Sequence, residues 1–175
     1  MTEFNFSQTR EKAEKDYGLG TGEYLKIKEG ENKIRLLTSC LAHSSTYKGQ
    51  TTFKWLCYVL DRVDGKIKPY FMPVIIYKAI ETLQLSEEYK FTEVPMPYDI
   101  SVNAIGAGQK TVKYTVVPAR VNTPLTDEEI KQLDEMLPIN ELQKKMVNRD
   151  KEEKSDEQPS PPSDQDEIDV SGIDF

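Results

Sequence analysis

The acidic end of this chain limits how much of it can form a folded core. Residues 150–175 hold ten Asp and Glu against two Lys, and no aromatic residue precedes Phe175 among them. We expect this tail to be disordered, because burial cannot offset the entropy that such a polar segment loses on ordering. About 120 of the preceding residues are left to build a core, which is enough for one compact domain.

Charge is divided unevenly along the chain. The net charge of −7 consists of −8 in the tail and +1 in residues 1–149, and residues 24–122 carry +5. A disordered polyanion can occupy a basic groove in place of nucleic acid, or it can dock on a basic partner protein. The acidic isoelectric point of 4.9 therefore does not argue against nucleic-acid binding.

The sequence indicates a cytoplasmic protein. No apolar run approaches the ~20 residues that span a membrane. Residues 1–6 lack the basic start and apolar stretch of a signal peptide. The two cysteines, Cys40 and Cys57, are expected to be free thiols in a reducing compartment. Residues 1–23, which contain three closely spaced glycines, are expected to form a flexible N-terminal segment.

From residue 24 onward the pattern is mainly that of β-strands. Asp64-Gly65 is a hairpin signal between two strands, and Ile76 and Ile80 have the spacing of a helix face. Residues 39–50 are polar and are expected to form a loop. The predicted strands are residues 24–38 (with a turn at 29–32), 51–62, 66–72, 98–104 and 111–117, and the predicted helix is 74–85.

Five strands with a helix between the third and the fourth have the order of an OB-fold, a small Greek-key barrel. We therefore predict an all-β to α+β protein with a five-stranded OB-fold barrel at residues 24–125. The sequence Thr126-Asp127-Glu128-Glu129 is a capping box that predicts a helix start, so residues 126–149 are expected to form a C-terminal helical appendix. The disordered tail follows at 150–175.

Single-stranded nucleic acid is held by cations that follow its backbone and by aromatic rings that stack on its bases. The second and third strands interleave both residue types. We expect their lysine-bearing faces to point outward, which favours Tyr58 and Tyr70 as stacking residues, while Phe71 and part of the Phe53–Trp55 row fill the core. The loops at 39–50 and 105–110 would flank this surface. The predicted DNA-binding residues are Tyr47, Lys48, Lys54, Trp55, Tyr58, Arg62, Lys66, Lys68, Tyr70, Lys110 and Lys113.

Each of these residues also has a simpler interpretation. An aromatic residue in a barrel commonly packs in the core, and a lysine is commonly a solvated surface charge. Catalysis has little support, because His43 is the only histidine and no catalytic motif is present. Cys40, His43 and Cys57 could supply three zinc ligands, but a structural zinc site needs four. We therefore predict a protein that is not an enzyme and that needs neither a metal nor a cofactor.

Three segments resemble phage single-stranded-DNA-binding proteins. They are residues 24–37 (YLKIKEGENKIRLL), 98–102 (YDISV) and 113–116 (KYTV), with the predicted helix in the matching place between them. The acidic tail ending in phenylalanine is similar to that of the T7-type phage protein. The resemblance covers roughly residues 24–125 together with the tail.

This resemblance implies an OB-fold that coats single-stranded DNA during phage replication, recombination and repair in the host cytoplasm. It also implies a tail that competes with DNA and recruits replication proteins, such as a DNA polymerase or primase-helicase, through Ile173, Asp174 and Phe175. Two alternatives remain open from the residues alone. The chain could be a protein-interaction module or inhibitor whose acidic tail mimics nucleic acid, or it could be a metal-dependent nuclease.

Overall fold

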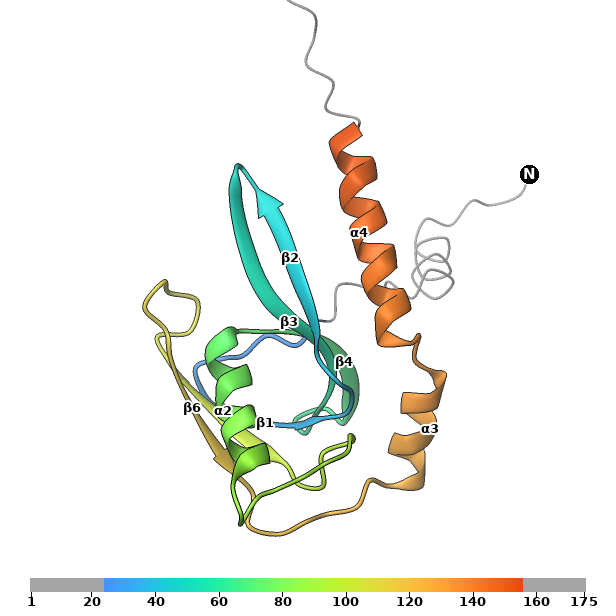
Figure 1. The fold of residues 1–175 in the computed structure, drawn as a ribbon. Helices are drawn as coiled ribbons and strands as arrows, with labels where there is room; N and C mark the ends of the chain where they lie inside the picture. The colour runs from blue at the N-terminus through green and yellow to red at the C-terminus, as the bar shows by residue number, and fades with distance from the viewer. Residues whose placement is uncertain (1–23, 156–175) are drawn as a thin grey trace, which may run out of the picture. The chain divides into compact units, whose positions relative to one another are not determined.

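The computed structural model describes residues 24–155, so the predicted N-terminal segment (1–23) and most of the predicted tail (156–175) lie outside the described residues. The chain divides into two units, residues 1–143 and 144–175. The described part of the second unit is the C-terminal portion of helix α4. The elements are β1 (Gly30–Leu36), β2 (Leu41–Tyr47), β3 (Gln50–Asp61), β4 (Lys66–Met72), α2 (Val74–Leu85), β5 (Ile100–Ile105), β6 (Lys113–Pro118), α3 (Asp127–Glu135) and α4 (Ile139–Ser155) (Figure 1).

The six strands form one antiparallel sheet, and the protein belongs to the α+β class. Strand β3 is central: β4 pairs along one edge, and β2 and β1 pair one after the other along the opposite edge. The sheet then continues from β1 through β5 to β6. Within residues 24–155 no strand pairing joins β4 to β6, so the sheet is not closed and the predicted closed barrel is not confirmed.

The structure confirms the strands predicted at 51–62 and 66–72 and the helix predicted at 74–85. The loop predicted at residues 39–50 is wrong, because most of it is strand β2, which forms a long hairpin with β3. The turn is tight: Lys48 and Gly49 both have positive φ, at 47° and 76°, as this kind of two-residue hairpin turn requires. Hydroxyl pairs link the two strands, with Ser45 Oγ 3.1 Å from Thr52 Oγ1. Strand β2 has no alternation of apolar and polar residues, because Ser and Thr occupy its consecutive positions 44–46.

The first predicted strand is shorter than expected. Residues 24–28 precede the sheet, and β1 begins at Gly30 with φ of 87°. The Asn32 side chain closes the turn before it, since its Oδ1 accepts from the Lys28 N–H at 2.9 Å and its Nδ2 donates to the Lys28 carbonyl at 2.8 Å. The Asp64-Gly65 signal lies in a four-residue loop rather than a two-residue turn, because Asp61 pairs with Lys66.

Strand β3 is buried on both faces over its second half. One face packs with α2 in the main core, to which Cys57, Val59, Met72, Ile76 and Ile80 all contribute. On the opposite face Leu56, Tyr58 and Leu60 are 0%, 3% and 0% exposed.

Helix α3 and the first residues of α4 make contacts with the sheet. Helix α3 packs against β4, and in α4 Gln143 Nε2 donates a hydrogen bond to the Ala42 carbonyl at 2.6 Å. The predicted capping box is confirmed at the start of α3, where Thr126 Oγ1 accepts from the Glu129 N–H at 3.2 Å. None of the helices in the described part of the chain is long and apolar enough to cross a membrane.

Candidate nucleic-acid interface

The strand register decides which predicted residues share a surface. Directly paired residues of an antiparallel sheet point to the same face. Leu56 pairs with Phe71, and Cys57 pairs with Tyr70. Lys54, two residues before Leu56, therefore shares a face with Phe71, whereas Lys68 and Tyr70 share the opposite face with Trp55. The prediction that the lysines of both strands line one outward surface is wrong.

Tyr58 and Tyr70 are interior residues, each 3% exposed. Burial raises the pKa of Tyr58 to about 12 and also raises the pKa of Tyr70 well above its ordinary value. Neither ring has a free face for a nucleotide base, so the prediction that these two tyrosines stack on bases is wrong. A lysine on the same strand face does not indicate that a tyrosine is exposed here, because β3 is covered on both faces beyond Trp55.

Arg62 and Lys68 are held in ion pairs within the protein. Lys68 Nζ lies 2.9 Å from Asp61 Oδ2 and 2.6 Å from Asp64 Oδ2. Arg62 Nη1 lies 2.5 Å from Glu129 Oε1. These carboxylates neutralise charges that were predicted to contact phosphate, so the predicted role of Arg62 and Lys68 in DNA binding is not supported by their placement.

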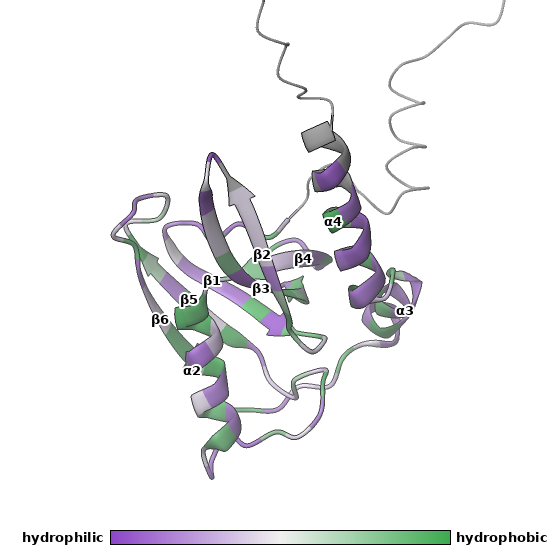
Figure 2. Ribbon diagram, turned by 45° about the horizontal axis from the view of Figure 1, so that its top comes forward, coloured by the Kyte–Doolittle hydropathy of each residue, from purple (hydrophilic) through white to green (hydrophobic). Residues whose placement is uncertain are grey.

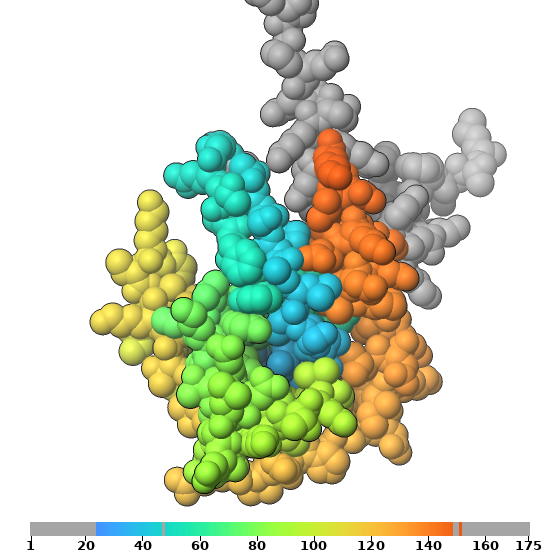
Figure 3. Space-filling model, viewed as in Figure 1, coloured from blue at the N-terminus to red at the C-terminus, as the bar shows by residue number. Residues whose placement is uncertain are grey.

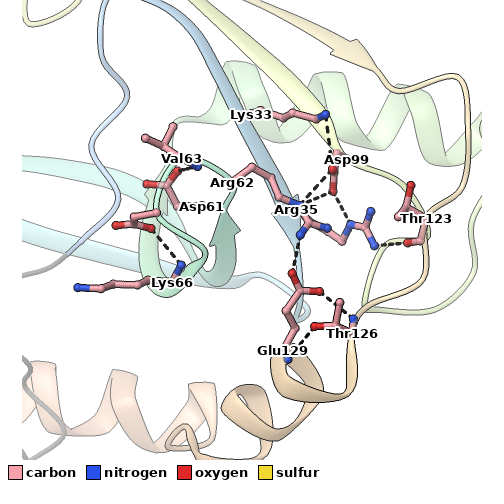
Figure 4. A network of polar contacts seen from close by, with 11 residues as sticks. Lys33, Arg35, Asp61, Arg62, Val63, Lys66, Asp99, Thr123, Thr126 and Glu129 are labelled. Atoms are coloured by element: carbon pink, nitrogen blue, oxygen red, sulfur yellow. Dashed lines mark hydrogen bonds and ion pairs between the residues drawn. The ribbon is translucent and has the colours of Figure 1, made fainter.

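Asp99, 8% exposed, is the centre of a larger network (Figure 4). Its carboxylate lies 2.6 Å from Arg35 Nε, 3.1 Å from Arg62 Nε and 4.0 Å from Lys33 Nζ. Arg35 also donates to the Thr123 carbonyl. The network joins β1, the turn after β3, the start of β5 and, through Arg62, helix α3. Because a buried charge is left unpaired when its partner is removed, we expect loss of Asp99 to destabilise the fold.

The structure brings together an aromatic row, defined here as Phe53, Trp55 and Tyr77. Trp55 stacks on Tyr77 with ring centroids 4.1 Å apart and an angle of 14° between the planes. Phe53 meets Trp55 edge-on at 5.3 Å and 84°. Phe53 is 46% exposed, so the row runs from the core out to solvent along the hairpin. The buried Trp55 Nε1 has no hydrogen-bond partner among the described residues.

Two members of this row were missed from the sequence. The sequence predicts that part of the Phe53–Trp55 row fills the core and that Trp55 binds DNA, and it assigns no role in binding to Phe53 or Tyr77. Tyr77 comes from α2, which packs against both β3 and β6. The signal was available, since Tyr77 lies next to Ile76 and three residues before Ile80, on the edge of the apolar helix face. Figure 2 shows the apolar character of the first turn of α2, where Ile75 is 55% exposed.

Exposed lysines lie on the two loops near this row. The β2–β3 hairpin and the β5–β6 loop project from the same end of the first unit, with α2 between them (Figures 1 and 3). The hairpin carries Lys48 and Lys54, and Tyr47 is the last residue of β2. The other loop carries Lys110 and leads to Lys113, and all four lysines are exposed. Lys66, also exposed, lies instead at the turn between β3 and β4.

The glycine-rich β5–β6 loop uses some of its backbone amides internally. The Glu29 carboxylate accepts from the Gly106 N–H at 3.2 Å and from the Ala107 N–H at 2.7 Å. Successive N–H groups that converge in this way bind anions. These two amides are therefore already paired with a carboxylate, and the lysines of this loop are its available phosphate-binding groups.

The three residues considered as zinc ligands do not converge. His43 pairs with Lys54 and so faces the opposite side of the sheet from Cys57. Within residues 24–155 no group of three or more His, Cys, Asp or Glu is arranged to hold a metal ion.

Comparisons of the chain with protein-family models, curated proteins and solved structures found no match. The resemblance to phage single-stranded-DNA-binding proteins therefore remains a prediction. The function proposed below is argued from the geometry of the aromatic row and the lysines near it.

Proposed function

We propose that this protein binds single-stranded DNA without sequence preference, with bases stacking at the outer end of the aromatic row. The half-exposed ring of Phe53 is the observation that carries the proposal. Folding gains little from an aromatic ring left 46% exposed, whereas a base can stack on it at a gain of ~1–3 kcal/mol. Trp55 contacts the Phe53 ring edge-on, and Tyr77 stacks on Trp55 behind it.

Charge supports the same surface. Lys48 on one side and Lys110 and Lys113 on the other are placed to neutralise phosphates on a strand that runs between the two loops, whereas Lys54 points to the opposite face of β3 from Phe53. Each contact would release condensed counterions, so affinity should fall as salt rises. Neither stacking nor phosphate contact depends on which base is present, so the binding should not depend on the DNA sequence.

The order of the strands supports the OB-fold part of the proposal. Strands β1 and β2 follow one another along the same edge of β3 and would together correspond to the long first strand of an OB-fold. An OB-fold is partly open and binds ligands at its second and third strands and at the loops after its first and fourth strands. Here those loops are the β2–β3 hairpin and the β5–β6 loop, which flank the aromatic row.

We propose the phage-type role that the sequence resemblance implies: coating of single-stranded DNA in replication, recombination and repair, without catalysis. The acidic tail would compete with DNA for the lysines and recruit replication proteins through its last residues. The rival role, an inhibitor acting through the tail alone, does not need an exposed aromatic row.

Anisotropy of a labelled oligothymidine, titrated with the full chain over a salt series, tests the proposal. Phe53→Ala should weaken binding roughly 5- to 150-fold at every salt concentration, which is ~1–3 kcal/mol per stacked base. Val63→Ala is the matched control, because Val63 is 81% exposed beyond the other end of β3. Wild-type affinity in Phe53→Ala would remove the stacking platform from the account.

A second pair of variants tests the charges. Lys110→Ala should reduce the salt slope of log affinity by about 0.7, the value for one phosphate contact on a single strand. Lys90→Ala, an exposed lysine after the C-terminal end of α2, should leave the slope unchanged. Equal slopes for all three proteins would show that Lys110 does not contact phosphate.

A further inference from the structure

The two cysteines of the chain lie beside the start of β2. Leu41, the first residue of β2, pairs with Leu56, so Cys40 directly precedes and Cys57 directly follows the last residue pair of this ladder. A disulfide bond joins cysteines whose Cα atoms are about 4.4–6.8 Å apart, so it requires two neighbouring positions of this kind.

The side chains of the pair also meet. Both belong to the main core, Cys57 as a buried member and Cys40 packed against it. Cys57 Sγ donates to the Tyr70 carbonyl at 3.8 Å, and the neighbouring Cys57 thiol lowers the pKa of Cys40 against the opposing effect of burial. The Cys40 thiol, together with burial, raises the pKa of Cys57 well above its ordinary value. Cys40 is therefore the better nucleophile of the two, because thiolates rather than thiols attack disulfides.

Access from solvent also favours Cys40 over Cys57 as the attacking thiol. Cys40 is half-buried and lines a cavity of about 300 Å³ between α2 and residues 91–94. Cys57 is 0% exposed. A small reagent that enters this cavity can reach Cys40, whereas it cannot reach Cys57 directly.

We propose that Cys40 and Cys57 are a redox modification site that takes a small disulfide, such as oxidised glutathione, as its substrate. The Cys40 thiolate attacks one sulfur of the small disulfide, whose S–S bond breaks and releases one small thiol. Cys57 then loses its proton and attacks Cys40 Sγ, which breaks the mixed disulfide and releases the second small thiol. The protein dithiol is oxidised by two electrons, and the small disulfide is reduced to two thiols. This site does not depend on the proposed DNA binding.

The test is a peptide map of the full chain after incubation with oxidised glutathione. Lys48 and Lys54 lie between the two cysteines, so trypsin separates Cys40 from Cys57 unless a disulfide joins them. The expected result is loss of both free thiols, one cross-linked peptide pair without bound glutathione, and recovery of separate peptides after dithiothreitol. Persistent glutathione on Cys40 with Cys57 free, disulfide-linked dimers, or no reaction would each overturn the proposal.

Two variants test the order of the steps. Cys57→Ser should stop at the mixed disulfide and retain glutathione on Cys40. Cys40→Ser should leave Cys57 unmodified while the protein is folded. Modification of Cys57 in folded Cys40→Ser at the wild-type rate would contradict the assignment of Cys40 as the attacking thiol. The wild-type peptide map decides whether the disulfide forms even if Cys57→Ser does not fold.

Discussion

Replacing Asp99 with Asn should destabilise the protein more than any other single change of a charged side chain in this network. Asp99 is the carboxylate that neutralises Arg35, whose side chain is 1% exposed. After Asp99→Asn the Arg35 guanidinium stays buried without a carboxylate partner, and it keeps its hydrogen bond to the Thr123 carbonyl. Arg62, at 22% exposure, keeps Glu129 and so loses less.

The magnitude follows from the buried pair. Removing one partner of a buried ion pair costs about 3–5 kcal/mol, because an uncompensated charge is left in the interior. For a domain of this size, 1 kcal/mol corresponds to roughly 4 °C in the unfolding midpoint. Asp99→Asn should therefore lower the free energy of unfolding by ~3–5 kcal/mol and the midpoint by ~12–20 °C.

Urea unfolding followed by circular dichroism, together with scanning calorimetry at neutral pH, measures both quantities. Asp64→Asn is the matched control. The Asp64 side chain is 37% exposed, and its partner Lys68 keeps Asp61. An exposed pair of this kind contributes up to about 1 kcal/mol. A loss for Asp99→Asn no larger than that of Asp64→Asn would refute the expectation that loss of Asp99 strongly destabilises the fold.

Three further predictions follow from burial and charge. Tyr70→Phe should leave stability unchanged or slightly raised and DNA affinity unchanged, because the buried Tyr70 hydroxyl has no hydrogen-bond partner among the described residues; a clear loss of either would contradict its interior placement. Burial raises the pKa values of Tyr58 and Tyr98 from 10.0 to about 12, so the stability that their neutral forms contribute is present below pH 10 and is lost as pH rises toward 12. In an alkaline titration the absorbance of ionised tyrosine should therefore increase over the same pH range in which the circular dichroism signal of the folded protein is lost. Ionisation of Tyr58 and Tyr98 at a pH where the circular dichroism is unchanged would contradict the prediction. Deleting residues 150–175 should tighten oligothymidine binding at low salt and have little effect at high salt, and equal affinity at every salt concentration would exclude competition by the tail.

Local patterns in the sequence predicted much of the fold correctly. The alternation in β3 and β4, the helical spacing of Ile76 and Ile80, and the Thr126 capping box all depend on neighbouring residues. Strand β2 could not be found in this way. Its Ser and Thr residues pair across the hairpin and leave no apolar stripe, so the signal for β2 lies in its pairing with β3.

The site was harder to predict because it depends on contacts between distant segments. Alternation shows which residues of one strand share a face. It does not show which residues of the neighbouring strand lie on that same face of the sheet. The register of β4 against β3 decides that question, and it places Tyr70 inward beside Cys57. The same limit explains why Tyr77 was missed, since its role comes from α2 stacking on Trp55 rather than from any local motif.

Fluorescence of Trp55 is the most direct test that DNA binds at the aromatic row. Trp55 is the only tryptophan of the chain, and it lies between the half-exposed Phe53 and Tyr77. Titration with unlabelled oligothymidine should change its emission in proportion to binding measured by anisotropy, and Phe53→Ala should shift both curves to higher concentration together. Tight binding by anisotropy with constant Trp55 emission would place the DNA elsewhere and contradict the account.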